Sequence, residues 1–143
     1  MLELTKASMG VSRTLGKILE KSLQKALNTN SDYINLSHTK EAIRENSKQY
    51  NEYFNGMIKK GVVASEYKEL LNDIISRAIE EQSKNKEKQS SFFTWLPSKE
   101  FYLSKLEENY LLHKIQHNHR LKERKIDVDV YSIDYGLCLE HKL

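Results

Sequence analysis

The chain has 143 residues and a formal net charge of +3, and its sequence is 38% hydrophobic and 30% charged. This length suits one domain or two very small ones, and the apolar content argues against a disordered chain. The single cysteine, Cys138, excludes an internal disulfide and favours a reducing compartment. No apolar run approaches the roughly 20 residues of a bilayer span, and no signal-peptide pattern opens the chain, so we expect a cytoplasmic protein that does not enter a membrane.

Three amphipathic helices are predicted in residues 1–82, and we expect them to form a helical bundle. In 12–28 the apolar residues recur at three- and four-residue steps and predict the buried face of the first helix: Leu15, Ile18, Leu19, Leu23, Ala26 and Leu27. The second helix runs to about Lys60, where Gly61 supplies a C-terminal stop. A serine is expected at the N-cap of each helix: Ser12, Ser37 and Ser65.

The second half of the chain is predicted to be a separate winged-helix-like unit over 92–143. Residues 83–91 are polar and aperiodic, which predicts a linker. A fourth helix is expected over 98–117, and the alternation of β-branched with other residues in 126–139 predicts two short strands. The turn of this C-terminal β-hairpin lies either in 132–136 or in the basic stretch before the first strand. The expected fold class is therefore mainly α, a helical bundle followed by this unit.

A turn near the start of the chain, Gly10-Val11-Ser12-Arg13, opens the first predicted helix. This turn resembles the sensor-2 turn in the helical lid of AAA+ ATPases and of their STAND and origin-recognition relatives. The segment Ile34-Asn35-Leu36-Ser37 and the helix after it follow the same order of elements, so the resemblance covers about the first 60 residues. It implies that Arg13 reaches the phosphates of a bound nucleotide. A guanidinium suits this role because it stays charged and can bind oxygens bidentately.

The resemblance also implies that the chain is the C-terminal end of a larger ATPase, with ATP as the cofactor of the whole protein. The chain itself contains no G-x-x-x-x-G-K-[ST] phosphate loop and no apolar strand that ends in paired acidic residues. Cys138 lies in no nucleophile motif. We therefore expect no cofactor, no catalytic residue and no enzyme activity in this chain alone.

A basic stretch before the predicted strands is a candidate for contacts with DNA phosphates, which would position the domain without reading sequence. Its candidate residues are Arg120, Lys122, Arg124 and Lys125. Lys114 belongs to the same cluster. Three aspartates follow at once and oppose a polyanion, so that a solvated loop is an equal alternative: Asp127, Asp129 and Asp134.

Two further groups of side chains are candidates for binding. The aromatic cluster Phe92, Phe93 and Trp95 is expected to pack on a neighbouring unit or to form a protein interface. The weak candidates for zinc ligands are His113, His117, Cys138 and His141. The two histidines at i and i+4 would share one face of the predicted helix, but the whole set matches no closed zinc pattern. We therefore expect no metal site.

These residues predict a non-catalytic regulatory region, which couples the nucleotide state of a missing P-loop core to a DNA or protein partner. Two alternatives stay open. One is a stand-alone helical protein-interaction module, which could be dimeric, and the other is a small winged-helix DNA-binding regulator. The sequence leaves the partner itself open.

Overall fold

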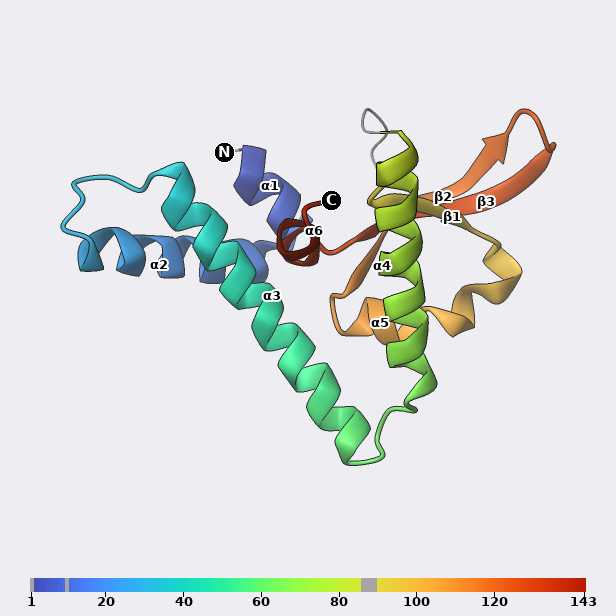
Figure 1. Cartoon of the computed structure of the whole chain (residues 1–143), viewed down its shortest axis with the longest axis horizontal. Coiled ribbons are helices and arrows are strands. Elements are labelled where there is room, and N and C mark those ends of the chain that lie inside the picture. Colours follow the sequence, from blue (N-terminus) through green and yellow to red (C-terminus); the bar gives the residue numbers. More distant parts are fainter. Residues whose placement is uncertain (1, 10, 86–89) are drawn as a thin grey trace.

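The computed structural model describes residues 2–9, 11–85 and 90–143 (Figure 1). The chain is mainly α-helical with one three-stranded antiparallel sheet, so the expected fold class is confirmed. The elements are, in chain order, α1 (Leu2–Ser8), α2 (Ser12–Asn28), α3 (Leu36–Lys59), α4 (Glu66–Lys84), β1 (Phe92–Trp95), the 3-10 helix η1 (Pro97–Tyr102), α5 (Ser104–Glu108), β2 (Leu112–Leu121), β3 (Ile126–Ile133) and α6 (Tyr135–His141). Among the helices of these ranges, none combines the length and the apolar character that a membrane crossing requires.

The long helix α3 connects the two ends of the molecule (Figure 1). Its first half packs against α1 and α2, and Lys25 of α2 pairs with Glu45 of α3 at 2.6 Å. Its second half carries Phe54 into the core that α4 and the sheet share. The C-terminal helix α6 contacts both α3 and α1, and its Tyr135 donates a hydrogen bond to the Glu3 carboxylate of α1. The chain therefore returns at its end to the helices with which it began.

The helix boundaries confirm one predicted signal and correct others. Gly61 ends α3 as predicted, since its φ of 71° is one that glycine adopts without steric cost. Asn35, and not Ser37, caps α3, because its side chain accepts the amide hydrogen of His38 in a reciprocal capping box. The predicted cap at Ser12 is wrong, since this residue is already helical. Ser65 does precede α4, but its side chain makes no cap hydrogen bond.

The buried face of α2 differs from the predicted one. Small and polar residues face α3, and they are buried together with one isoleucine: Thr14, Ile18, Ser22 and Ala26. The small side chains allow a close approach to Ala42 of α3, and the Ser22 hydroxyl is satisfied by the Ile18 carbonyl at 2.7 Å. Three of the leucines that the periodicity placed inside are exposed instead: Leu19, Leu23 and Leu27.

The predicted fourth helix over 98–117 is wrong beyond Glu108. Two short helical segments, η1 and α5, occupy its beginning, and β2 starts at Leu112. The chain cannot continue as a helix because Tyr110 has a φ of 60°, which lies in the left-handed region. The residues that follow pair with β3 instead, so a partner distant in sequence overrides the local helical spacing.

The sheet has the strand order β1-β3-β2, with both neighbouring pairs antiparallel. The β2–β3 hairpin turns in residues 122–125, so the turn lies in the basic stretch, and the alternative in 132–136 is wrong. The second of the two predicted strands is wrong as well. Asp134 caps α6 with its side chain and thereby ends β3 at Ile133.

The core of the sheet half combines helices and strands. Side chains of α3, α4, α5, β2, β3 and α6 form one buried cluster, in which Leu106 and Tyr131 are fully buried. In chain order this half of the molecule consists of helix α4, strand β1, helices η1 and α5, and the β2–β3 hairpin. The winged-helix-like assignment of 92–143 stays a prediction. The predicted linker, 83–91, lies partly outside the described residues, and the domain boundaries stay a prediction.

Candidate functional site

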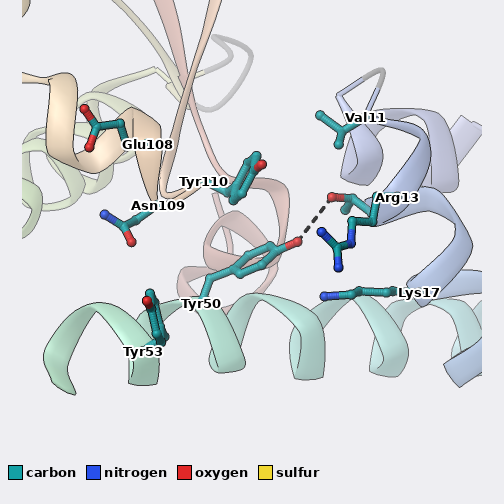
Figure 2. A pocket seen from close by; sticks show the side chains of 9 residues that line it. Val11, Arg13, Lys17, Tyr50, Tyr53, Glu108, Asn109 and Tyr110 are labelled. Carbon is teal, nitrogen blue, oxygen red and sulfur yellow. Dashed lines mark hydrogen bonds between the residues drawn. The ribbon is translucent and has the colours of Figure 1, made fainter. Parts of the chain in front are cut away.

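A cleft of about 550 Å³ lies where α2 and α3 face the turn between α5 and β2 (Figure 2). It brings together basic, aromatic and amide side chains from these three elements: Arg13 and Lys17 of α2, Tyr50 and Tyr53 of α3, and Asn109 and Tyr110 of the turn. The predicted sensor-like residue, Arg13, is therefore part of a cleft. Gly10, the first residue of the turn that precedes Arg13 in the sequence, lies outside the described residues.

The basic wall of the cleft consists of Arg13 and Lys17, which stand one helical turn apart. Both side chains are exposed and extend into the cleft in Figure 2. Neither makes an ion pair with any residue that the structure describes. The carboxylate across the cleft, Glu108, is engaged by Lys105 at 2.7 Å. The cleft therefore carries two cationic groups that are free to bind an anion.

The aromatic wall is fixed from two directions. The rings of Tyr50 and Tyr110 lie 5.2 Å apart between centroids and are tilted by 33°, an arrangement in the range of favourable aromatic pairs. The Tyr50 hydroxyl lies 3.2 Å from Oγ1 of Thr14, the hydrogen bond drawn in Figure 2, which links this wall to α2. Tyr53 stands at the rim, with 68% of its surface exposed.

Tyr110 occupies a backbone position that favours glycine. Its amide donates to the Glu107 carbonyl at 3.0 Å, and the next amide, of Leu111, donates to the Leu106 carbonyl at 2.9 Å. This pair of bonds is the Schellman motif that commonly ends a helix, and its left-handed residue is usually glycine. A bulky residue there costs on the order of 1 kcal/mol. The chain carries an aromatic ring at this point despite that cost.

A buried cluster around Asp134 holds the elements of the cleft together. The Ser47 hydroxyl of α3 donates to Asp134 Oδ2 at 2.6 Å, and Nε2 of His113 on β2 lies 3.5 Å from Oδ1. The same carboxylate accepts the amide hydrogens of Gly136 at 3.0 Å and Leu137 at 3.3 Å at the start of α6. Asp134 thus connects α3, β2 and α6, which lie far apart in the sequence.

The predicted basic cluster is divided between the hairpin tip and the sheet. Lys122, Arg124 and Lys125 are exposed at the tip of the β2–β3 hairpin, and they make no ion pair within the described residues. Arg120, at the base of the turn, lies 3.3 Å from Asp127 on the paired strand. Three cations are therefore available at the tip, whereas the charge of Arg120 is partly neutralised.

Lys114 belongs to the sheet and faces a buried carboxylate. Its ammonium pairs with Glu100 and lies 3.4 Å from Asp129 Oδ2. Burial acts against its charged form, but Glu100, Tyr131 and Asp129 together outweigh this effect and raise the pKa of Lys114. Burial likewise opposes ionisation of Asp129, yet the Asn118 amide at 3.1 Å and His117 at 2.7 Å lower the pKa of this carboxyl. Lys114 is thus occupied within the protein.

The weak candidates for metal ligands do not come together. His113 and His117 lie on strand β2 and not on a helix, and they pair with different aspartates. Cys138 is buried in α6, where burial raises the pKa of its thiol to about 12. His141 is exposed at the end of the same helix. Over the described residues, no three side chains of histidine, cysteine, aspartate or glutamate are grouped so that they could hold a metal ion.

The aromatic cluster of β1 is partly used within the fold. Phe93 stacks on Tyr131, with centroids 5.8 Å apart, and the Trp95 indole donates to the Lys99 carbonyl at 2.8 Å. Phe92 points to the other face of the strand and is 42% exposed. The role of these three residues in an interface stays a prediction, and only Phe92 presents a large exposed area.

Comparisons of the chain with protein-family models, with curated proteins and with solved structures find no match. We therefore infer the function from the geometry of the cleft. Sequence reasoning found Arg13 but missed its neighbours. Lys17 follows Arg13 at helical i,i+4 spacing, which is a signal that could have found it. The helical spacing of Tyr50 and Tyr110 predicts a core position for each ring, and nothing local in the sequence pairs them with each other.

Proposed function

We propose that the chain is a non-catalytic regulatory region of a P-loop ATPase, and that it couples the nucleotide state of a separate core to a DNA or protein partner. Arg13 is the residue that senses the nucleotide in this proposal. The single observation that carries it is that the Arg13 guanidinium is exposed, unpaired within the described residues and extended into an open cleft beside Lys17. Arg120, in contrast, is engaged by the Asp127 carboxylate and has less of its charge available to a ligand.

A continuous set of packed elements supports the coupling. The helix that carries Arg13 packs on α3, and α3 is tied through Ser47 to Asp134, the residue directly after β3. The other end of β3 is the basic hairpin tip. A phosphate contact that shifts α2 could therefore bias the position of the hairpin, as packed elements with two arrangements do in other coupled systems.

The sensor role is tested on the native polypeptide that contains this chain, isolated from its source. We expect it to hydrolyse ATP, and Arg13→Ala to lower the rate by roughly 100-fold, as removal of one charge-stabilising donor does. Arg77→Ala, which removes an exposed arginine on α4, is the matched control and should leave the rate unchanged. A native polypeptide without ATPase activity, alone or in its complex, would refute the proposal.

The hairpin tip is the proposed contact with DNA phosphates. Binding to a duplex is measured by fluorescence anisotropy at several salt concentrations. Replacing Lys122, Arg124 and Lys125 together by alanine removes three charges, so the slope of log K against log salt should fall by roughly 2–3. Lys48→Ala, on the exposed face of α3, is the control. If the slope of log K against log salt is equal in the triple variant and the wild type, the hairpin tip does not contact DNA. The proposed partner would then be a protein.

A stand-alone interaction module is the second candidate, and one observation favours it. Leu19, Leu23 and Leu27 form an exposed stripe on α2, because residues four apart share one helix face. Sedimentation analysis of the wild type against Leu23→Glu tests this alternative. Association that depends on concentration and is lost in Leu23→Glu, but persists in Trp95→Ala, would place the interface on α2.

A further inference from the structure

We propose that the cleft in Figure 2 binds a nucleotide by itself. The phosphates would lie on Arg13 and Lys17, and the base on the aromatic wall, which we call the tyrosine wall. The preferred ligand is a nucleotide whose base carries an exocyclic amino group. This inference goes beyond the proposed function, because all binding groups belong to this chain, and it stands whether or not the chain is joined to a P-loop core.

The size of the cleft suits a mononucleotide. Its volume of about 550 Å³ lies within the range of about 300–1,000 Å³ that is typical of small-molecule sites. The two ends of the cleft also differ chemically. In Figure 2, Arg13 and Lys17 lie at one end and Asn109 at the other, with Tyr50 and Tyr110 between them. A ligand with an anionic end and a flat polar end matches this order.

The basic end selects an anion. Arg13 and Lys17 are four residues apart on α2, so that both can reach oxygens of one phosphate or of neighbouring phosphates. Two like charges at this spacing repel each other when no anion is bound. A phosphate bound between them attracts both cations and offsets this repulsion. Glu108 does not cancel this effect, because Lys105 engages its carboxylate.

The aromatic wall selects a ring. Tyr50 is held by Tyr110 and by Thr14, so the wall is in place before a ligand arrives. Tyr110 keeps 40% of its surface exposed, and Tyr53 exposes more at the rim. The left-handed backbone of Tyr110 favours glycine, yet the chain presents a ring there. Bases stack on such rings with little regard to sequence, so the wall by itself selects a base but not its identity.

The amide of Asn109 supplies a preference among bases. Its Nδ2 donates to the Lys105 carbonyl at 2.7 Å, which fixes the orientation of the side chain. Its Oδ1 accepts no hydrogen bond from the residues that the structure describes, and it remains an acceptor at the cleft. Adenine and cytosine can donate an exocyclic amino hydrogen to such an oxygen, whereas uracil offers a carbonyl oxygen at the same place.

The test is titration of the purified chain with ATP by isothermal calorimetry, with no core protein present. We expect a Kd of roughly 0.1–1 mM for ATP, with weaker binding of UTP, inorganic triphosphate and adenosine. Arg13→Gln and Tyr110→Asn should each raise the Kd about tenfold, since one removes a charge-assisted contact and the other a stacking surface. Asparagine is chosen because it tolerates the left-handed backbone, so Tyr110→Asn should remain folded.

Matched controls separate binding from general effects. Arg77→Gln and Tyr33→Asn change an exposed arginine and an exposed tyrosine away from the cleft, and they should leave the Kd unchanged. Absence of ATP binding at about 10 mM overturns the inference, as does a Kd that changes equally in Arg13→Gln and Arg77→Gln. Inorganic triphosphate that binds as tightly as ATP overturns the role of the tyrosines. Tighter binding of a single-stranded oligonucleotide overturns the assignment to a mononucleotide. These outcomes are independent of the ATPase assay on the native polypeptide.

Discussion

Gly136→Ala should destabilise the protein strongly, because α6 approaches α3 too closely for a side chain at this point. A Cβ atom at Gly136 would lie 2.2 Å from the Ser47 Cβ and 2.7 Å from its Oγ. The Ser47 Cβ is attached directly to the backbone of α3 and cannot rotate away. The whole of α6 must therefore move, and with it Asp134, whose carboxylate accepts the Ser47 hydrogen bond at 2.6 Å.

The expected magnitude follows from these two effects. Overpacking of a tightly packed site costs about 1–3 kcal/mol, and the loss of a hydrogen bond to a charged group costs about 1.5–3 kcal/mol. The free energy of unfolding should therefore fall by about 2.5–6 kcal/mol. At about 2–4 °C per kcal/mol for a chain near this length, the Tm should drop by roughly 5–24 °C.

Thermal unfolding followed by circular dichroism measures this effect against a matched control. Gly56→Ala places the same methyl group in α3, where nothing lies within 4 Å of it, and should stabilise the protein by about 0.5–1 kcal/mol. Ser47→Gly removes the clashing Cβ, so it should raise the Tm of the Gly136→Ala variant although it lowers that of the wild type. An unchanged Tm in Gly136→Ala, or no rescue by Ser47→Gly, would refute the close approach of α6 and α3.

Three further variants or probes test the local structure. Cys138, whose thiol pKa is raised to about 12 by burial, should react with a disulfide reagent at pH 8 only after unfolding, and rapid reaction of the native protein would contradict its placement. Asp129 has a lowered folded-state pKa, so its contribution to stability is present above the ordinary value of 3.8 and is lost as the pH falls through the folded value. The difference in unfolding free energy between the wild type and Asp129→Asn should therefore shrink toward pH 2, and a difference that grows there would contradict the shift. Asn35→Ala should lower the unfolding free energy by about 1 kcal/mol through loss of the capping box, whereas Ser37→Ala should not; equal effects in denaturant titrations would restore Ser37 as the cap.

Local signals in the sequence predicted helices α2, α3 and α4, because the causes of these helices are local. Gly61 was recognised as a helix stop, since few other residues adopt its φ without strain. The first of the two strands predicted in 126–139, which corresponds to β3, was recognised from β-branched residues at a period of two. The segment 112–117 was misassigned because Leu111 and Ile115 have helical spacing, while its strand pairing depends on β3 and on two register irregularities. Such pairing has no signal within the segment itself.

The site was predictable only in part. Arg13 was singled out because it follows Gly10 by three residues at a helix start, which is a local pattern. The tyrosine wall was missed because Tyr50 and Tyr110 meet only when α3 crosses the turn after α5, and this crossing is a tertiary feature. The left-handed backbone of Tyr110 also has no signature in sequence, since the same motif is ordinarily identified by its glycine. Helical spacing alone therefore placed both rings in the core.

The cluster around Asp134 joins the two walls of the cleft. One wall belongs to α2 and α3, and the other follows directly from α5 into β2. These walls are joined where Ser47 binds Asp134, whose amide in turn donates to the Leu111 carbonyl at 3.0 Å, one residue from Tyr110. We therefore expect a displacement of α6 that moves Asp134 to shift the backbone beside Tyr110 relative to α3. Gly136→Ala should consequently weaken ATP binding as well as stability, although Gly136 does not line the cleft. Binding that stays intact in a folded Gly136→Ala protein at low temperature would show that the walls are held by other contacts.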